Sequence, residues 1–329
     1  MNTIGIIGAG AWGTALALIV HRANHRAILW AHETDTVAAI RERRENPFLP
    51  GVTLDPAITA TNDMKEAAAV DAILLVPPAQ HLRAVAAALA PHVKNDPPVV
   101  ICAKGIESKT GALMSEALAA SIPRARAGVL SGPTFAAEVA RGLPTAVTLA
   151  SADEAACAAV ASALASRHFR IYRSDDVTGA QLGGAVKNVI AIACGVVMGR
   201  GFGDNARAAL ITRGLAEIAR LGRAMGAKPE TVMGLSGLGD LALTCTGEQS
   251  RNLSLGIALG RGEKIADILT KRRSVAEGVA TAGSVVTLAA RHGVEMPIAA
   301  AVDAVANKGA DIDATIAALL SRPSAQEEA

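Results

Sequence analysis

A lysine lies in the middle of an apolar, glycine-containing segment that runs from Gln181 to Cys194 and is predicted to be helical. Burial of an ammonium group in apolar surroundings is costly unless a carboxylate pairs with it or its pKa falls. Gly183 and Gly184 precede Lys187 by about one helical turn, so the three share a helix face. We expect that face to combine an amine with open space for a ligand. A core helix whose lysine reaches out to solvent is the competing interpretation.

Two polar segments lie downstream of this lysine. The stretch 237–240 reads as a glycine loop that enters a helix, and Asp240 either caps that helix or orients Lys187 and bonds a substrate hydroxyl. The next predicted helix begins with a serine, an arginine and an asparagine, Ser250–Asn252. A guanidinium at a helix start suits a phosphate group, because the helix end and the Arg251 fork both attract an anion. An exposed helix start explains the same residues.

Two segments upstream follow predicted strands. In an open α/β sheet, ligands bind outside the carboxyl ends of the strands. Lys104 occupies such a place, although a surface lysine is the competing interpretation. In the stretch 131–135, Gly132 offers its backbone to a ligand, and Thr134 either caps the following helix or binds substrate.

The chain begins with a dinucleotide fingerprint, G-A-G-A-W-G at 8–13, between a predicted strand and a predicted helix. This context is what the motif requires, since the same sequence elsewhere is a weak signal. Gly8 permits a tight turn, Gly10 lets a pyrophosphate approach the backbone, and Gly13 allows the helix to pack closely on the strand. The helix N-terminus then supplies free N–H groups for the phosphates.

The end of the second predicted strand bears on the choice between NAD and NADP. An acidic residue there binds the ribose hydroxyls and disfavours a 2′-phosphate. Here His32 occupies roughly that place and Glu33 follows it. We therefore expect NADPH to be accepted, and the pattern leaves acceptance of NADH open; an ordinary exposed histidine is the alternative.

The remaining pattern predicts a Rossmann-type, mainly parallel α/β domain followed by an all-α domain. Short apolar runs alternate with helical stretches in the first half, as in βαβ units with strands buried on both faces. The strands are expected at Thr3–Ile7, Ala27–Trp30, Ala72–Val76, Pro98–Cys102, Ala127–Leu130, Ala146–Leu149 and Phe169–Tyr172. Only helical segments follow, at 176–198, 205–225, 229–234, 250–260, 264–269, 278–292, 297–306 and 311–320. We place the domains at 1–174 and 175–329.

Composition excludes several functional classes. The chain has 329 residues with a net charge of +2 and 2% aromatic residues, which argues against a nucleic-acid-binding protein. Its 4 cysteines form no C-x-x-C pair, which favours reduced thiols in the cytoplasm over zinc or disulfides. The first strand leaves no room for a signal peptide, and we expect no membrane span and no metal.

Taken together, these motifs resemble the bacterial-type NAD(P)-dependent glycerol-3-phosphate dehydrogenases. The matching stretches run in the family's order: G-A-G-A-W-G at 8–13, A-K-G at 103–105, S-G-P-T-F at 131–135, L-G-G-A-V-K-N at 182–188, G-L-G-D at 237–240, S-R-N at 250–252 and V-A-E-G at 275–278. The first stretch is generic to dinucleotide enzymes, whereas those around Lys187 and Ser250–Asn252 are far more specific.

The resemblance implies a role for each matching residue. Lys187 becomes the catalytic acid/base. The residues implied to bind substrate are Lys104, Gly132, Thr134, Lys187, Asp240, Ser250, Arg251 and Asn252. Those implied to bind the cofactor, beside Gly8, Gly10 and Gly13, are Ala11, Trp12, His32, Lys104, Ala136, Arg251, Val275 and Glu277. The position after Gly10 varies in the family and is Ala11 here.

The implied activity is reversible reduction of dihydroxyacetone phosphate to sn-glycerol 3-phosphate with NADP or NAD, for glycerophospholipid synthesis. The implied assembly is a cytoplasmic homodimer. One alternative is a related dehydrogenase that acts on a β-hydroxy or keto acid, which requires a carboxylate site instead of a phosphate site. Another is a non-catalytic NADP-sensing protein with the same fold.

Overall fold

The computed structural model describes residues 1–270 and 276–323, which form two compact units. The first unit comprises Met1–Ala103 and Met114–Val177. The second comprises Lys104–Leu113 and the described residues from Thr178 onward. The predicted domains 1–174 and 175–329 differ from this division chiefly in Lys104–Leu113. That segment follows strand β5 (Pro98–Ile101), and its Ile106 is fully buried in the core of the second unit.

The first unit is built on an 8-stranded sheet with the order β3-β2-β1-β4-β5-β6-β7-β8. Its neighbouring strands pair in parallel except β6 and β7, which are antiparallel. The remaining strands are β1 (Thr3–Ile7), β2 (Arg26–Trp30), β3 (Thr59–Thr61), β4 (Ala72–Leu75), β6 (Arg126–Ser131), β7 (Thr145–Ala150) and β8 (Phe169–Ser174). The predicted mainly parallel α/β class is confirmed. The three-residue β3 was not predicted, because so short a strand shows no apolar run.

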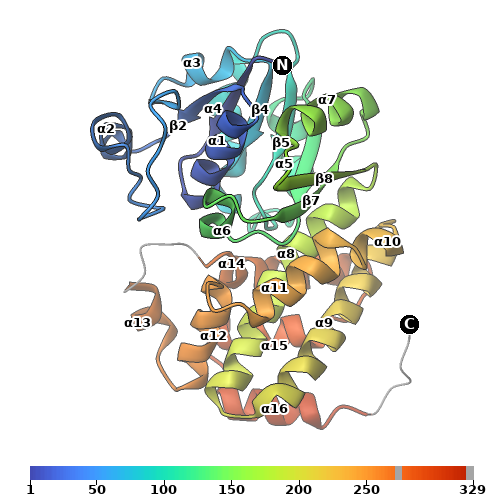
Figure 1. The fold of residues 1–329 in the computed structure, drawn as a ribbon. Coiled ribbons are helices and arrows are strands. Elements are labelled where there is room, and N and C mark those ends of the chain that lie inside the picture. Colours follow the sequence, from blue (N-terminus) through green and yellow to red (C-terminus); the bar gives the residue numbers. More distant parts are fainter. Residues whose placement is uncertain (271–275, 324–329) are drawn as a thin grey trace. The chain divides into compact units, whose positions relative to one another are not determined.

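Helices cover this sheet and complete its core (Figure 1). Apolar side chains from the central strands, such as Ile4 and Leu74, pack with Leu16 of the first helix. The helices are α1 (Ala11–Arg22), α2 (Thr34–Arg43), α3 (Met64–Ala68), η1 (Ala79–His81), α4 (Leu82–Leu89), η2 (Ala90–His92), α5 (Met114–Ser121), α6 (Ala136–Ala140) and α7 (Glu154–Leu164). Parallel strands joined by helices place the strand ends, and the loops that follow them, at one edge.

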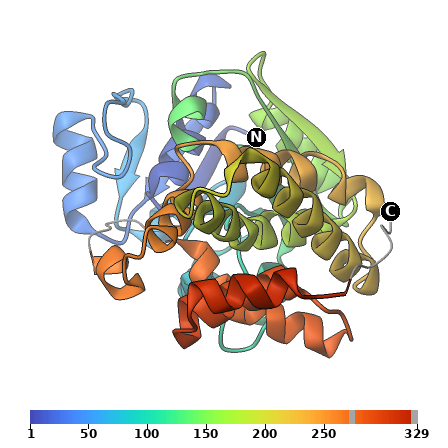
Figure 2. The ribbon, with the colours of Figure 1, turned by 90° about the horizontal axis from the view of Figure 1, so that it is seen from below.

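The described residues of the second unit form helices and loops, except that the segment Lys104–Leu113 contains an isolated β-bridge between Ile106 and Leu113. The unit contains α8 (Val177–Gly199), α9 (Gly203–Ala224), α10 (Pro229–Val232), a π-helical turn η3 (Leu235–Gly239), α11 (Asp240–Thr246), α12 (Arg251–Gly260), α13 (Ile265–Thr270), α14 (Glu277–Arg291), α15 (Pro297–Lys308) and α16 (Ile312–Leu320). Helix α8 forms the centre of the core, and α15 and α16 lie side by side near the end of the chain (Figure 2). The predicted all-α second half is confirmed.

Glycines let α8 and α12 approach each other closely. A Cβ atom on Gly195 would stand 2.2 Å from the carbonyl oxygen of Leu253, and one on Gly256 would stand 2.1 Å from that of Ile192. Both positions therefore exclude any side chain. Helix α8 is long and apolar enough to cross a membrane, but 89% of its apolar window is buried inside the protein, as in a core helix. This helix carries Lys187.

Candidate active site

The fingerprint glycines occupy the turn between β1 and α1, where each has a distinct steric reason. Gly8 has φ of +123°, a backbone region that other residues rarely adopt, and its N–H donates to the Trp30 carbonyl at 3.0 Å. A Cβ on Gly13 would lie 1.8 Å from the Gly8 oxygen, so only glycine lets the helix start this close. A Cβ on Gly10 would meet nothing within 4 Å, which leaves the backbone open to a ligand.

This turn fits the pyrophosphate of a dinucleotide. The N-cap residue of α1 is Gly10, without a side-chain cap, and the first turn, which holds Ala11 and Trp12, carries no acidic residue. The helix end therefore keeps its attraction for an anion. The indole nitrogen of Trp12 is buried and has no hydrogen-bond partner among the described residues, so a donor remains for a bound group. The predicted cofactor role of these residues remains a proposal.

Sequence reasoning missed a residue that holds the glycine turn in place. The buried amide of Asn46 donates to the Ala9 carbonyl at 2.9 Å and to the Thr14 hydroxyl at 2.7 Å. The Thr14 hydroxyl in turn donates to the Gly10 carbonyl at 2.9 Å. Asn46 lies in the loop after α2, far from the motif in sequence, so only the fold could reveal this contact.

The cofactor-discriminating position lies at the end of β2. His32 is exposed and its ring lies 6.2 Å from that of Trp30. Asn62 supports this turn by donating to the Ala31 carbonyl at 2.7 Å. Glu33 is the N-cap residue of α2 but makes no capping hydrogen bond with its side chain. An exposed histidine beside a helix start agrees with tolerance of a 2′-phosphate.

Gly132, Thr134 and Ala136 also belong to the first unit. Gly132 adopts φ of +146°, and the Thr134 hydroxyl donates to its carbonyl at 3.2 Å. The alternative prediction that Thr134 caps the following helix is wrong, because the N-cap residue of α6 is Phe135 and no side chain caps it. Ala136 begins α6 and packs against the core of its unit. The roles implied for these three residues stay predictions.

In the second unit, one carboxylate joins two lysines. Lys187 Nζ lies 2.6 Å from Asp240 Oδ1, and Lys104 Nζ lies 2.7 Å from Asp240 Oδ2. The Asp240 side chain is completely buried, and those of Lys187 and Lys104 are 8% and 16% exposed. The structure thus brings together three residues far apart in sequence. The helix is a core helix, but Lys187 does not reach out to solvent, so that part of the competing interpretation is wrong.

The environment of Lys187 lowers the pKa of its ammonium to about 8, chiefly because burial disfavours the charged form. The positive charge of Lys104 lowers it further, whereas the charge and hydrogen bond of Asp240 oppose the shift. The sign of this shift was not readable from the sequence. A lysine with this pKa takes up and releases protons near neutral pH, which an ordinary lysine does not.

Sequence reasoning also missed the contact between Lys187 and a threonine hydroxyl. Lys187 Nζ donates to the Thr244 hydroxyl at 2.7 Å, and that hydroxyl donates to the backbone carbonyl of Asp240 at 2.6 Å. Thr244 lies one turn after Asp240 on α11, so the two residues share a helix face. This spacing is the signal that could have identified Thr244 once Asp240 was suspected.

The segment before Asp240 differs from the predicted open loop. Residues 235–239 form a π-helical turn, a rare geometry often found at functional sites. Asp240 is the first residue of α11 rather than its cap, so its carboxylate is free to bind the lysines. The predicted clearing beside Lys187 is also wrong at Gly183, where a Cβ would stand 2.3 Å from the Ser236 carbonyl oxygen. The absence of a side chain at Gly183 therefore makes room for the backbone of Ser236 and not for a ligand.

The start of α12 lies next to this cluster. The Ser250 hydroxyl caps the helix by accepting the Leu253 N–H at 3.2 Å. The Asn252 amide nitrogen donates to Asn188 Oδ1 at 2.9 Å, and its oxygen accepts the Gly278 N–H at 3.0 Å. Asn252 thus ties α12 to α8 and to the start of α14, a positioning role beside the predicted substrate contact.

Two of the remaining implied cofactor residues are each the first residue of a helix. Arg251 is the exposed first residue of α12, and Glu277 is the first residue of α14. Val275 lies outside the described residues. Their implied contacts stay predictions.

An open glycine turn on a parallel sheet, together with a second unit that holds a lysine of lowered pKa, defines a nicotinamide-dependent dehydrogenase. The chain belongs to the family of NAD-dependent glycerol-3-phosphate dehydrogenases. Residues 3–157 match the model of that family's N-terminus, and residues 176–317 match the model of its C-terminus.

Curated relatives and a solved structure agree with this assignment. The chain is 59% identical over 325 residues to glycerol-3-phosphate dehydrogenase [NAD(P)+] of Rhodospirillum rubrum, with 98% of this chain and 93% of the relative covered. It is 56% identical over 321 residues to the enzyme of the same name from Parvibaculum lavamentivorans, with 97% and 96% covered. The crystal structure of glycerol-3-phosphate dehydrogenase from Coxiella burnetii matches with a TM-score of 0.94 at 38% identity, covering 98% of this chain and 99% of that one.

Proposed function

We propose that this protein reversibly reduces dihydroxyacetone phosphate to sn-glycerol 3-phosphate with NADPH or NADH, and that Lys187 is its acid/base. Family membership supports the reaction. The observation that carries the role of Lys187 is its burial against Asp240 and Thr244 with a pKa lowered to about 8. A group with that pKa is present in both protonation states near neutral pH, which a reversible proton transfer needs.

The proton moves between Lys187 and the oxygen at C2 of the substrate. The bound dinucleotide supplies, or takes back, the hydride at C2. In the reducing direction the Lys187 ammonium donates a proton to the ketone oxygen as negative charge develops there, and the neutral amine is reprotonated from solvent. In the oxidising direction the neutral amine removes the hydroxyl proton. Asp240 and Thr244 hold the nitrogen in one position, which favours transfer to one oxygen.

Positive charge near this lysine suits a phosphorylated substrate. Lys187 and Lys104 share a single carboxylate, so the cluster carries a formal charge of +1 when both lysines are protonated. The backbone N–H groups at the start of α12 and the Arg251 guanidinium add a site for the phosphate. We assign Lys104, Gly132, Thr134, Asp240, Ser250, Arg251 and Asn252 to the substrate, with Asn252 also positioning the helices around it.

On the cofactor side, we assign the open backbone at Gly10 and the first turn of α1 to the pyrophosphate. His32 lies at the position where an acid would exclude a 2′-phosphate, which supports acceptance of NADPH. The product is the backbone precursor of glycerophospholipids. We further propose a homodimer in the cytoplasm, where the free cysteines Cys102, Cys157, Cys194 and Cys245 would stay reduced.

A substrate comparison tests the proposal. Oxidation of NADPH and of NADH is followed at 340 nm, in parallel, with dihydroxyacetone phosphate and with unphosphorylated keto acids. We expect turnover with the phosphorylated ketone and little with the acids. A larger kcat/KM for a keto acid would favour the alternative, a related dehydrogenase with a carboxylate site. Binding of NADPH without turnover of any ketone would identify a sensor.

A further inference from the structure

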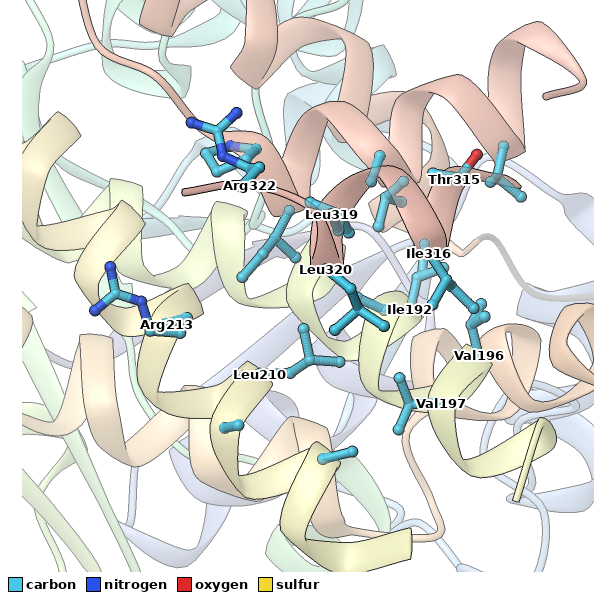
Figure 3. A pocket seen from close by; sticks show the side chains of 18 of the residues that line it. Ile192, Val196, Val197, Leu210, Arg213, Thr315, Ile316, Leu319, Leu320 and Arg322 are labelled. Atoms are coloured by element: carbon cyan, nitrogen blue, oxygen red, sulfur yellow. The ribbon is translucent and has the colours of Figure 1, made fainter. Parts of the chain in front are cut away.

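The helical unit contains a cavity that the proposed reaction does not use. It has a volume of about 930 Å³, which is within the usual range for small-molecule sites. Its lining comes from α8, α9, α12, α15 and α16, and the apolar side chains include Ile192, Val196, Leu210, Ile316 and Leu319 (Figure 3). An apolar surface of this kind gains free energy when a ligand removes it from water.

The charged groups of this cavity lie toward one side. Figure 3 shows Arg213 and Arg322 apart from each other but on the same side of the cavity, while Val196 and Ile316 lie toward the other side, near Thr315. Arg220 also lines the cavity, with the carboxylates of Glu217 and Glu295. The cavity is therefore amphipathic along its length, with a charged end and an apolar end.

The two carboxylates are already engaged. Glu217 accepts the Ile298 N–H at 2.6 Å and the Ala299 N–H at 3.3 Å, so it anchors the start of α15. Burial also raises the pKa of the Glu217 carboxyl to about 7, which reduces its negative charge. Glu295 pairs with Arg322 at 2.7 Å.

The arginines outnumber these carboxylates. Arg220 donates to the backbone carbonyl of Glu295 at 3.4 Å, which uses no carboxylate. Among residues 1–270 and 276–323, Arg213 has no hydrogen-bond or ion-pair partner. A positive end beside an apolar chamber complements a ligand with a negative head and a hydrocarbon body.

We propose that this cavity binds a single-chain anionic amphiphile, such as a medium-chain fatty acid, with its head at Arg213 and its chain along α8 toward Val196. The carboxylate forms charge-assisted hydrogen bonds with the guanidinium of Arg213. The chain lies between α8, α9 and α16 and covers Leu210, Ile316 and Leu319, which line the cavity.

Isothermal titration calorimetry with the full-length protein tests this site. The probes are octanoate, decanoate and dodecanoate below their micelle concentrations, with dodecanol and dodecyltrimethylammonium as neutral and cationic controls. We expect saturable binding of one molecule per chain, tighter by roughly fourfold for each added methylene. The neutral control should bind at least tenfold more weakly than dodecanoate, and the cation should not bind.

Three variants locate the ligand. Leu210→Trp fills the middle of the cavity and should abolish binding, and Arg213→Ala should weaken dodecanoate about tenfold or more while leaving dodecanol within twofold. Arg261→Ala, an exposed arginine that caps the end of α12 outside this cavity, is the control and should bind as the unaltered protein does. Unchanged turnover of dihydroxyacetone phosphate shows that each variant is folded, since none of these residues belongs to the proposed active site.

Several results would overturn the proposal. They are the absence of saturable binding, equal binding of anionic and cationic probes, or binding that survives Leu210→Trp. Sedimentation equilibrium supplies a further one. If the unaltered protein is a dimer that Leu210→Trp converts to a monomer, the apolar lining belongs to a contact between two copies and not to an amphiphile site.

Discussion

The glycine turn of the first unit and the lysine cluster of the second are constructed in opposite ways. The turn is made of backbone, and its properties come from side chains that are absent at Gly8, Gly10 and Gly13. The cluster is made of side chains, and its properties come from the charges of Lys104, Lys187 and Asp240. The first is contained in six consecutive residues, whereas the second combines α8, α11 and the segment after β5.

This difference determines how each site responds to substitution. A backbone site loses function when a side chain is added. Whether the added side chain blocks the ligand or disrupts the fold depends on the space around it. A charge cluster fails when a side chain is removed, and the groups left behind change their protonation. The following substitutions and pH measurements separate these two behaviours.

The largest effect is expected for Lys187→Met. This change removes the proton donor, so kcat for dihydroxyacetone phosphate should fall about 10³-fold, while affinity for NADPH stays within twofold. Steady-state kinetics and fluorescence titration of NADPH measure the two quantities. Lys308→Met, which alters an exposed lysine of α15, should leave both unchanged. A kcat for Lys187→Met within tenfold of the unaltered enzyme would remove Lys187 from the mechanism.

Asp240→Asn should have the next largest effect. It leaves two buried or nearly buried ammonium groups without their carboxylate, which should cost about 3–5 kcal/mol in the free energy of unfolding. Turnover should fall about 10²-fold, because Asp240 no longer orients the amine. Urea titration and kinetics measure these effects. Asp313→Asn is the control. It removes an ion pair with Arg200 at the surface and should lower the free energy of unfolding by less than about 1 kcal/mol. Equal losses of stability in the two variants would show that burial of the Asp240 ion pairs has no effect.

Gly10→Ala and Gly13→Ala form a matched pair on the backbone site. At Gly10 a methyl group enters open space, so stability should change by less than about 1 kcal/mol while KM for NADPH rises roughly tenfold or more. At Gly13 the methyl group meets the Gly8 carbonyl oxygen, so the free energy of unfolding should fall by several kcal/mol. Thermal melts and NADPH titrations distinguish them. Equal melting temperatures for the two variants would contradict the steric explanation.

The protonation of Lys187 predicts opposite pH dependences for the two reaction directions. Because the pKa is about 8, kcat/KM for glycerol 3-phosphate should rise tenfold per pH unit below 8 and level off above it. For dihydroxyacetone phosphate, kcat/KM should be constant below pH 8 and should fall above pH 8. Initial rates between pH 6 and 10 measure both profiles, and the same direction for both would contradict the assignment.

The free energy of unfolding should also depend on pH through Lys187. The pKa of Lys187 falls from 10.5 to about 8 on folding, so between these values the unfolded chain binds more protons and stability rises with pH. The gain should amount to roughly 3 kcal/mol from pH 8 to 10.5. The difference between the unaltered protein and Lys187→Met in urea titrations measures this gain together with any change in the titration of Asp240 and Lys104, which interact with Lys187.

The smallest effect is expected for Thr244→Val. The loss of one acceptor from the Lys187 ammonium should lower the pKa of Lys187 further and reduce kcat about fivefold, with little change in KM. Thr246→Val is the control, because the Thr246 hydroxyl donates to the Ala242 carbonyl one turn back on the same helix and is exposed. A pH profile that stays in place in Thr244→Val would restrict Thr244 to a structural role.

Local patterns predicted most of the fold. The continuous apolar runs of β1, β4 and β5 predict buried parallel strands. The helical patterns of the second half predict most of the helices between α8 and α16. The β3 strand has only three residues and lies at the sheet edge, so it leaves no such pattern. The antiparallel direction of β7 was equally unreadable, because strand direction depends on the connection and not on composition.

The candidate site was less predictable. Lys187 and Asp240 were recognised because a charge in an apolar helix and an acid after glycines are unusual. The contacts of Asn46 and Thr244 were missed, since each depends on a partner that only the fold brings near. Thr134 and Gly183 show the opposite error. From its residue type alone, Thr134 was predicted to cap a helix and Gly183 to leave open space. In the structure, the neighbouring backbone determines what each residue does.

The discontinuity of the second unit has a practical consequence for dissecting the protein. A fragment that begins at Thr178 would contain Lys187 and Asp240 but lack Lys104, and it would lose the buried side chains of Ile106 and Leu113. The Thr110 carbonyl that receives the Arg291 guanidinium at 2.9 Å would be missing as well. The helical unit is therefore not a separable C-terminal module. Exchange of helical domains between relatives has to carry residues 104–113 along with it.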